Sequence, residues 1–412
     1  MFITFLYILL AIAVLLLLIM VHEFGHYVAG KILKFKIKEF SIGFGKAIFS
    51  KTNERTGEKF SIRIFPLGGY CAFEGEDEEG ETEGAFNKQK PWKRLIVLFA
   101  GVFFNFVFGV ITSVIYLAVC VFGVPKISAI TDGNPNAFLA GDIVTAVNGK
   151  PIEIYRPFDQ MVKDFGENEE FVVTVNRGGE IIDLKVKKVN IKACRYVQTP
   201  EKLYGKVYYY DGANYHLFSD EQLLSHLKNV NASLDRLYKY DAETGEYTLY
   251  KASEIGELGG VYEKSAGVSL GILYGLSAKS YSFGEALLKA FPFVFYICGL
   301  ILGVLGGLFT GATSVKDVGG TITAVSEIVK ISKIDISSLL YLIPLLSINL
   351  ALFNILPIPA LDGARMVFVI IEWIRGKPLN RNVEAYIHFF GLVILFALVI
   401  FLDVYHLFFV RV

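Results

Sequence analysis

Two histidines and a glutamate lie within five residues, in the segment His22-Glu23-Phe24-Gly25-His26. Residues four apart share one face of a helix, so both imidazoles can bind a single Zn²⁺. Glu23 follows the first histidine and is a candidate general base toward a water that the metal activates. The simpler interpretation is a pair of interfacial histidines at a helix end. We favour the metal because the segment directly follows an uncharged run, where ionisable groups are costly and need a partner.

A zinc site needs a third protein ligand, and Asp362 is the best candidate. It ends a long uncharged run, in the sequence Asn-Ile-Leu-Pro-Ile-Pro-Ala-Leu-Asp-Gly of residues 354–363. Pro357 and Pro359 would break a helix there, and non-helical backbone at membrane depth is tolerated where it lines a cavity. For Asp362 considered alone, a helix-terminating aspartate is the alternative. Together with the two histidines, it predicts a site for one Zn²⁺ per chain.

The composition indicates a membrane protein. Of the 412 residues, 53% are hydrophobic and only 19% are charged, whereas soluble domains carry about 25% charged residues. Forty basic and forty acidic residues leave no net charge, which argues against nucleic acid as a partner. The four cysteines lie far apart and form no C-x-x-C pair, so we predict neither a zinc knuckle nor a disulfide framework.

Four long uncharged runs, the last with one histidine near its start, are predicted to span the lipid bilayer: residues 2–21, 95–124, 336–361 and 385–402. A cleaved signal peptide is disfavoured for the first, because no basic stretch precedes it and no small-x-small site follows it. Lysines and arginines gather after the first run, before the second and after the third. By the positive-inside rule these connections are cytoplasmic, so the N-terminus and the segment between the second and third runs lie outside.

One further apolar run, residues 290–315, does not fit this alternation. If it crossed the membrane, the run at 336–361 would travel in the wrong direction for its own flanking charges. Pro292 and four glycines also indicate something less regular than a spanning helix. We therefore expect residues 285–335 to be membrane-embedded or interfacial on the external side.

The remaining boundaries follow from composition. Residues 1–125 form an N-terminal membrane half and residues 336–412 a C-terminal one. Between them, residues 126–284 have short β-branched runs and turn signals, which predict an external α+β domain. Residues 191–262 within it are tyrosine-rich and polar, and we interpret them as an insertion with a hairpin turn at Glu243-Thr244-Gly245.

At this point the chain resembles a known family over nearly its whole length: the site-2 protease intramembrane zinc metalloproteases, peptidase family M50, and in particular their bacterial RseP/RasP-type branch. Together the motifs that carry the resemblance are highly specific. They are His22-Glu-Phe-Gly-His26, Phe40-Ser-Ile-Gly-Phe-Gly45, Pro66-Leu-Gly-Gly-Tyr70, Ala100-Gly-Val-Phe-Phe-Asn105 and the segment at 354–363.

The resemblance implies a role for each motif. It implies that His22, His26 and Asp362 bind the zinc and that Glu23 is the catalytic base. The membrane asparagines of the family correspond to Asn105 and Asn354, which would help to position the substrate backbone or the site.

Two further elements are implied. Gly68, Gly69 and Tyr70 would lie in a membrane-associated β-hairpin that presents the substrate in extended form. The external domain looks like a PDZ module, with Ala-Gly-Asp-Ile-Val-Thr-Ala-Val-Asn-Gly at residues 140–149 as its signature. There are departures: Ala364 stands where the family has a second glycine after the aspartate, Val102 replaces a proline, and only one PDZ module is recognisable.

We therefore predict a polytopic α-helical membrane protein with about four transmembrane helices, a membrane-associated β-hairpin and an extracytoplasmic PDZ-like α+β domain. The expected activity is that of a zinc metalloendopeptidase of a bacterial plasma membrane, with its active site near the cytoplasmic side. Its partners would be single-pass transmembrane substrates such as anti-sigma factors or remnant signal peptides, trimmed beforehand by another protease. A catalytically silent PDZ-containing scaffold and a metal transporter are the alternatives, and the oligomeric state stays open.

Overall fold

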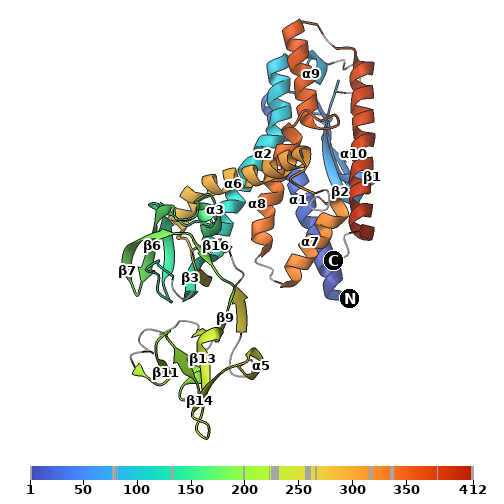
Figure 1. Cartoon of the computed structure of the whole chain (residues 1–412). Coiled ribbons are helices and arrows are strands. Elements are labelled where there is room, and N and C mark those ends of the chain that lie inside the picture. Colours follow the sequence, from blue (N-terminus) through green and yellow to red (C-terminus); the bar gives the residue numbers. More distant parts are fainter. Residues whose placement is uncertain are drawn as a thin grey trace. The chain divides into compact units, whose positions relative to one another are not determined.

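The chain divides into two compact units, Met1–Cys120 with Tyr281–Val412, and Val121–Ser280. Figure 1 shows the computed structural model, in which the first unit is mainly helical and the second is mainly strands. The structure describes residues 2–76, 80, 82–130, 134–197, 200–221, 223, 232–255, 261–264, 267–314, 319–334, 338–377 and 379–409.

Seven helices, each at least 14 residues long, make up most of the described part of the first unit. Their sequences are rich in Leu, Ile, Val and Phe, and the local start signals are present in two of them. Pro91 occupies the first turn of α2, where a missing N–H costs nothing. Ser282 and Glu285 form a capping box before α6. The helices are α1 Phe2–Ile32, α2 Pro91–Val119, α6 Phe283–Thr310, α7 Thr321–Ile334, α8 Leu339–Ile355, α9 Asp362–Arg375 and α10 Arg381–Phe409.

By length and composition, four of the described helices could cross a membrane: Thr4–Ile32, Pro91–Val119, Phe283–Leu308 and Asn382–Phe408. The prediction of a polytopic helical membrane protein is thus confirmed, but one of the four helices differs from the four predicted runs. The run at 336–361, which we expected to span, contains the shorter apolar helix Leu339–Ile355, and the proline-containing run at 290–315 belongs to a long helix. Pro292 lies inside that helix and does not end it.

Helix α6 runs across the axes of α2 and α8 in Figure 1 rather than alongside them. Its fully buried Phe293 stacks on Tyr116, near the C-terminal end of α2, with ring centroids 5.6 Å apart. The same ring contacts Tyr341, near the start of α8, at 6.2 Å. Helix α6 therefore packs at the end of the bundle where α2 finishes and α8 begins.

The predicted hairpin is present as two long antiparallel strands, β1 Ile37–Thr52 and β2 Lys59–Phe73. Residues 37–42 pair with residues 69–73, and residues 39–42 also pair with residues 59–62. Among the described residues, the stretch 69–73 pairs only with β1. It is therefore an edge of the small sheet.

A buried polar cluster holds the hairpin together. The Glu39 carboxylate accepts hydrogen bonds from Ser61 (2.5 Å), Arg63 (2.7 Å) and Tyr70 (2.9 Å). Burial opposes the charge of Glu39, but these hydrogen bonds and the Arg63 charge outweigh it and lower the pKa of its carboxyl. Burial, and then the hydrogen bond to Glu39, raise the pKa of Tyr70.

The second unit is built on an antiparallel sheet of order β17-β3-β4-β6-β7, with β5 paired to β4. Its inward side chains, including Ile127, Val144, Val173 and Val175, are fully or almost fully buried. The elements of this part are β3 Phe122–Ile130, β4 Ile143–Val147, β5 Lys150–Pro151, α3 Phe158–Lys163, β6 Glu170–Arg177, β7 Glu180–Lys187 and β17 Ile272–Lys279.

The rest of this unit forms smaller sheets with a core of their own around Phe218, Leu203 and Leu237. The expected hairpin turn at 243–245 is confirmed, because it joins two paired strands of the tyrosine-rich sheet. The strands are β8 Val189–Ile191, β9 Cys194–Val197, β10 Tyr208–Tyr210, β11 Tyr215–Leu217, β12 Ala232–Ser233, β13 Leu237–Asp241, β14 Glu246–Leu249, β15 Val261–Lys264 and β16 Gly267–Ser269, with the short helix α5 Ala252–Ile255.

A buried ion pair anchors the larger sheet. Asp142 has 0% of its surface exposed and accepts two hydrogen bonds from the Arg177 guanidinium and one from the Leu139 N–H, each of 2.8 Å. Arg177 keeps 30% of its side chain exposed, so without Asp142 the guanidinium stays partly solvated; the loss of its charged acceptor, and of the acceptor of the Leu139 N–H, costs about 1–3 kcal/mol.

We therefore expect Asp142→Ala to destabilise the sheet in the full chain. Amide hydrogen exchange in β3 and β4 should accelerate by roughly 5- to 150-fold, as the loss of about 1–3 kcal/mol implies. The exposed Asp164 at the end of α3 provides the control variant Asp164→Ala, which should leave exchange unchanged. Equal exchange rates in the two variants would contradict this assignment.

Candidate metal centre

The first helix presents two histidines to one point, as their spacing predicts. His22 and His26 lie on one face of α1 and expose only 6% and 7% of their surface. Their Nε2 atoms are 3.1 Å apart, and their rings meet edge to face with centroids 4.7 Å apart. Both imidazoles therefore offer the same ring atom to a shared partner.

Asp362 supplies the third donor from the far end of the chain. Its Oδ2 lies 2.9 Å from Nε2 of His22 and 3.2 Å from Nε2 of His26. A tetrahedral ion at ligand distances of about 2.1 Å holds its donors roughly 3.4 Å apart, so a small adjustment would seat Zn²⁺ among these three atoms. In the part of the chain that the structure describes, one group of three or more His, Cys, Asp or Glu side chains lies close enough to share a metal ion, and it is these three residues. The donor set, two imidazoles and one carboxylate, fits zinc.

The His26 ring is oriented by the backbone of the next helix. Its Nδ1 donates a hydrogen bond of 2.8 Å to the carbonyl oxygen of Val97 in α2. This contact fixes the tautomer that leaves Nε2 free to bind a metal, and such outer contacts set the orientation of metal-binding histidines.

Two glycines allow α1 and α2 to approach closely enough for this arrangement. A Cβ at Gly25 would lie 2.4 Å from the carbonyl oxygen of Ala100. A Cβ at Gly101 would lie 2.5 Å from Nε2 of His26 and 2.7 Å from Cε1 of His22. These distances are far inside van der Waals contact, so no larger residue fits at either position unless the helices or the rings move.

A third glycine shapes the turn that presents Asp362. Helix α8 ends at Ile355 and α9 starts at Asp362, and the segment between them contains Pro357 and Pro359. A Cβ at Gly363 would lie 2.2 Å from the carbonyl oxygen of Leu356. The two helices therefore meet tightly at this corner. Ala364, which differs from the family pattern, is buried with 4% exposed and is accommodated.

Glu23 lies beside the cluster and is held by the hairpin. Its Oε2 accepts a hydrogen bond of 3.0 Å from the backbone N–H of Cys71. Cys71 belongs to the edge stretch of β2, so this N–H points away from the sheet and toward the site. Burial, and then the charge of Glu23, raise the pKa of the Cys71 thiol.

The two asparagines differ in their surroundings. Asn105 is completely buried in α2, one turn beyond Gly101, and neither atom of its side-chain amide has a hydrogen-bond partner among the described residues. Its backbone carbonyl accepts a hydrogen bond of 2.8 Å from Ser347 in α8. Asn354 lies in the last turn of α8, is partly exposed, and its side chain makes no hydrogen bond to a described residue.

The hairpin glycines lie against α1. A Cβ at Gly69 would be 2.7 Å from the Met20 sulfur, and Gly68 adopts a φ of +148°, with the Phe44 ring 2.4 Å from its would-be Cβ. Tyr70 points into the Glu39 cluster of the hairpin. Gly69 thus brings the edge of the sheet within one helical turn of His22.

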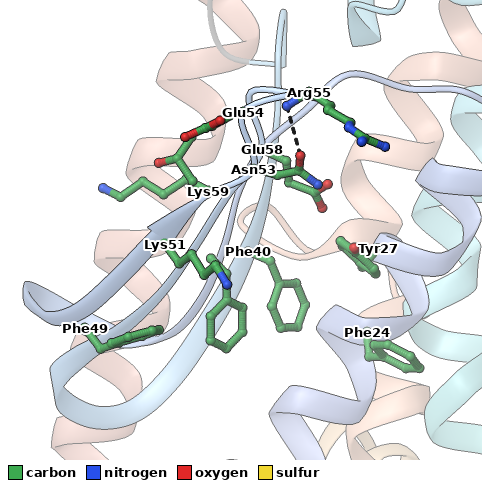
Figure 2. A pocket seen from close by; sticks show the side chains of 12 residues that line it. Phe24, Tyr27, Phe40, Phe49, Lys51, Asn53, Glu54, Arg55, Glu58 and Lys59 are labelled. Atoms are coloured by element: carbon green, nitrogen blue, oxygen red, sulfur yellow. Dashed lines mark hydrogen bonds between the residues drawn. The ribbon is translucent and has the colours of Figure 1, made fainter.

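A cavity of about 900 Å³ opens between the hairpin and α1 on the side of Phe24. Figure 2 shows Phe24 and Tyr27 of α1 opposite Phe40 and Phe49 of the hairpin, with charged and polar side chains gathered toward the hairpin turn. The polar end is lined by Lys51, Thr52, Asn53, Glu54, Arg55, Glu58 and Lys59. An extended segment with an apolar and a polar part would fit this lining.

Sequence reasoning missed the roles of Gly25, Gly101 and the Cys71 N–H. The two glycines stand inside motifs that we quoted for the resemblance, and small residues in apolar helices are a general signal of close helix packing. No sequence signal points to Cys71, because the contact uses its backbone.

We expect Gly101→Ala to weaken zinc binding, because its Cβ displaces one or both imidazoles. The dissociation constant for Zn²⁺, measured by competition with a chelator in detergent, should rise about 10–100-fold, as for the loss of other contacts that orient metal ligands. Gly303 in α6 has no heavy atom within 4 Å of its would-be Cβ, so Gly303→Ala is the matched control. Wild-type affinity in Gly101→Ala would refute the steric argument.

Several curated proteins are similar to this chain. One from Fusobacterium nucleatum is 27% identical over 96% of this chain and 97% of its own length, and one from Pasteurella multocida is 28% identical over 94% and 95%. Both carry the name "Putative zinc metalloprotease". The Regulator of sigma E protease of Haemophilus influenzae is 25% identical over 95% of each chain. The family model described as Peptidase family M50 matches residues 10–398. This chain therefore belongs to peptidase family M50 and is a multi-pass membrane zinc metalloprotease of the site-2 type.

Proposed function

We propose that this metalloprotease cleaves single-pass transmembrane proteins within or at the edge of the membrane, after another protease has trimmed their external part. The candidate substrates are anti-sigma factors or remnant signal peptides, and the former fit the likeness to a relative from Haemophilus influenzae named Regulator of sigma E protease. The observation that carries the proposal is the convergence of His22, His26 and Asp362 beside Glu23, between helices long and apolar enough to cross a bilayer.

In this proposal His22, His26 and Asp362 hold one Zn²⁺ through Nε2, Nε2 and Oδ2. When bound, the ion acts as a Lewis acid that polarises a carbonyl and lowers the pKa of water. Glu23 takes the proton of the attacking water on a carboxylate oxygen and delivers it to the leaving amine nitrogen. The Cys71 N–H orients that carboxylate through its 3.0 Å hydrogen bond.

The substrate must be extended at the site, because a helical backbone hides its carbonyls in internal hydrogen bonds. The edge stretch of β2 offers it a strand to pair with, next to Gly68, Gly69 and Tyr70. Strand addition to a sheet edge supplies main-chain hydrogen bonds that do not depend on the substrate sequence. It also stabilises the unwound segment in surroundings where an unpaired backbone group is costly.

Asn105 is the side chain best suited to hold the substrate backbone. Its amide is fully buried and unpaired among the described residues, and leaving such a group unpaired costs about 1–3 kcal/mol. A group retained at that cost close to the metal cluster fits a partner that arrives with the substrate. Asn354, in the last turn of α8, is assigned the same role by resemblance alone.

The proposed location is a bacterial plasma membrane, with the N-terminus outside and the metal cluster near the cytoplasmic face. The lysines and arginines that surround the hairpin and follow α9 support this orientation. Helix α6 packs across the end of the bundle marked by Tyr116 and Tyr341, so it would lie at the external interface. Crossing rather than parallel packing favours this over a full crossing of the membrane by α6.

The external domain is proposed to be PDZ-like. The segment at 140–149 forms β4 with a tight turn in which Asn148 and Gly149 have φ of +46° and +71°, and the sheet and the short α3 suit a small α+β module. It would either capture peptides by strand addition or exclude substrates with large external parts. A silent PDZ scaffold and a metal transporter are the competing functions for the whole chain.

Glu23→Gln separates the protease from both alternatives. The variant should keep one Zn²⁺ per chain, because Glu23 is no ligand, and should lose at least about 100-fold in turnover of a test transmembrane substrate, as expected when a general base is removed. Zinc content is measured by metal analysis of the purified chain and cleavage by gel assay. Undiminished cleavage in Glu23→Gln would refute the role of this residue.

The test of Asn105 uses stability as its internal control. Asn105→Leu removes a buried, unpaired amide, so we expect the melting temperature in detergent to stay level or rise. Cleavage should fall by about 100–1000-fold, as for the loss of one transition-state hydrogen-bond donor. The exposed Asn190 of β8 gives the matched control Asn190→Leu, with unchanged cleavage. A parallel fall in melting temperature and activity would instead mean that Asn105 has a structural role.

A further inference from the structure

The turn that presents Asp362 is held from outside by the last helix. Ala360, two residues before Asp362, has a φ of +81°, a left-handed conformation that only glycine adopts without strain. A non-glycine residue persists there only when its surroundings over-determine it. Two contacts that α10 makes hold Ala360 and its neighbour Pro359.

The first contact is a hydrogen bond. The backbone N–H of Ala360 donates to Nδ1 of His388 in α10, at 3.1 Å. Because Nδ1 accepts, the ring proton of His388 must be on Nε2. The ring itself is braced by Phe368 of α9, which it meets edge to face with centroids 5.4 Å apart.

The second contact is steric and lies three residues further along the same helix face. A Cβ at Gly391 would lie 2.2 Å from Cβ of Pro359 and 2.9 Å from its carbonyl carbon. The backbone of α10 therefore lies directly on the turn at this point. The two contacts are independent, since one needs an acceptor at position 388 and the other needs the absence of a side chain at position 391.

These two contacts are notable because most of the α10 surface is not covered by other parts of the protein. In its most apolar 18-residue stretch, within the fully described span Asn382–Phe408, no residue is buried. At its far end Asp403 accepts hydrogen bonds from the N–H groups of Ile322 (3.1 Å) and Thr323 (3.0 Å) at the start of α7. The helix is therefore fixed at the far end to α7 and near its start to the turn that carries Asp362.

We propose that His388 is a positioning residue for the metal centre. Through the Ala360 N–H, and with Gly391 seated on Pro359, it holds the 356–361 turn in the strained conformation that aims Asp362 at His22 and His26. The inference rests on the proposed role of Asp362 as a zinc ligand. His388 contacts the turn at Ala360 and helix α9 at Phe368, and its effect on the ligand geometry is exerted through these contacts.

The test compares zinc affinity and the Co²⁺ spectrum in the full chain. His388→Phe keeps an aromatic ring against Phe368 but has no acceptor for Ala360. We expect its Zn²⁺ dissociation constant, measured by chelator competition, to rise about 10–100-fold. The visible absorption of the Co²⁺-substituted protein should shift and change in intensity, because it reports the geometry of the ligand set.

Rescue separates positioning from mere packing. His388→Asn places an amide oxygen near the former Nδ1, so it should recover most of the zinc affinity and the wild-type Co²⁺ spectrum. Gly391→Ala should reproduce the defect of His388→Phe although it leaves the histidine in place. His406→Phe, the same change near the far end of α10, is the matched control and should behave like wild type.

Asp362→Ala is the reference that tells two failures apart. If it loses zinc while His388→Phe keeps wild-type affinity and spectrum, the positioning role is overturned and the ligand assignment survives. If Asp362→Ala itself keeps zinc, the proposed ligand set is wrong. Equal losses in His388→Phe and His388→Asn, with lowered melting temperatures in both, would reduce His388 to a structural residue and also overturn the inference.

Discussion

The two imidazoles of α1 can lie against α2 only if no side chain stands between the two helices, and glycine meets that condition where α1 and α2 cross. Gly25 lies against Ala100, and Gly101 leaves the space that the two imidazoles fill. Within lipid there is no hydrophobic force to press helices together, so close van der Waals packing of small residues is what stabilises such a crossing. The Val97 carbonyl then reaches His26, and the orientation of the ligands follows from the packing of the helices.

The third donor is positioned by a different device. Asp362 begins a helix, and the turn before it contains two prolines and a left-handed alanine. The N–H groups of Ile358 and Leu361 bond to carbonyls within the turn, whereas that of Ala360 bonds to His388 of α10, so part of the turn's shape depends on what surrounds it. Gly363 fixes the corner against the end of α8, and α10 covers the turn from the other side. The site is thus rigid on the side of α1 and α2 and externally supported on the side of Asp362.

The sequence was sufficient for the parts of the molecule that follow short-range rules. The four-residue spacing of His22 and His26 predicted a shared face, and the long apolar runs predicted spanning helices. The hairpin glycines, however, gave no indication that β2 would send the Cys71 N–H to Glu23. That contact and the one between His388 and Ala360 join elements far apart in sequence through backbone atoms, which carry no residue-type signal. The course of α6 also needed the structure, because the sequence does not show that one helix continues through Pro292 and packs against Tyr116 and Tyr341.

Peptide hydrolysis in a membrane has to solve two backbone problems together, and the hairpin addresses both in the proposed mechanism. The edge of a sheet leaves N–H and C=O groups unpaired, which is unfavourable where water is scarce. Glu23 satisfies one of these groups, the Cys71 N–H, and is itself oriented by it. An extended substrate would satisfy further groups along the same edge, and its own unwound backbone would be paired in return. The strand that would receive the substrate also holds the base. A substrate paired to it in the correct register would therefore have its scissile carbonyl at a fixed position relative to the Glu23 carboxylate.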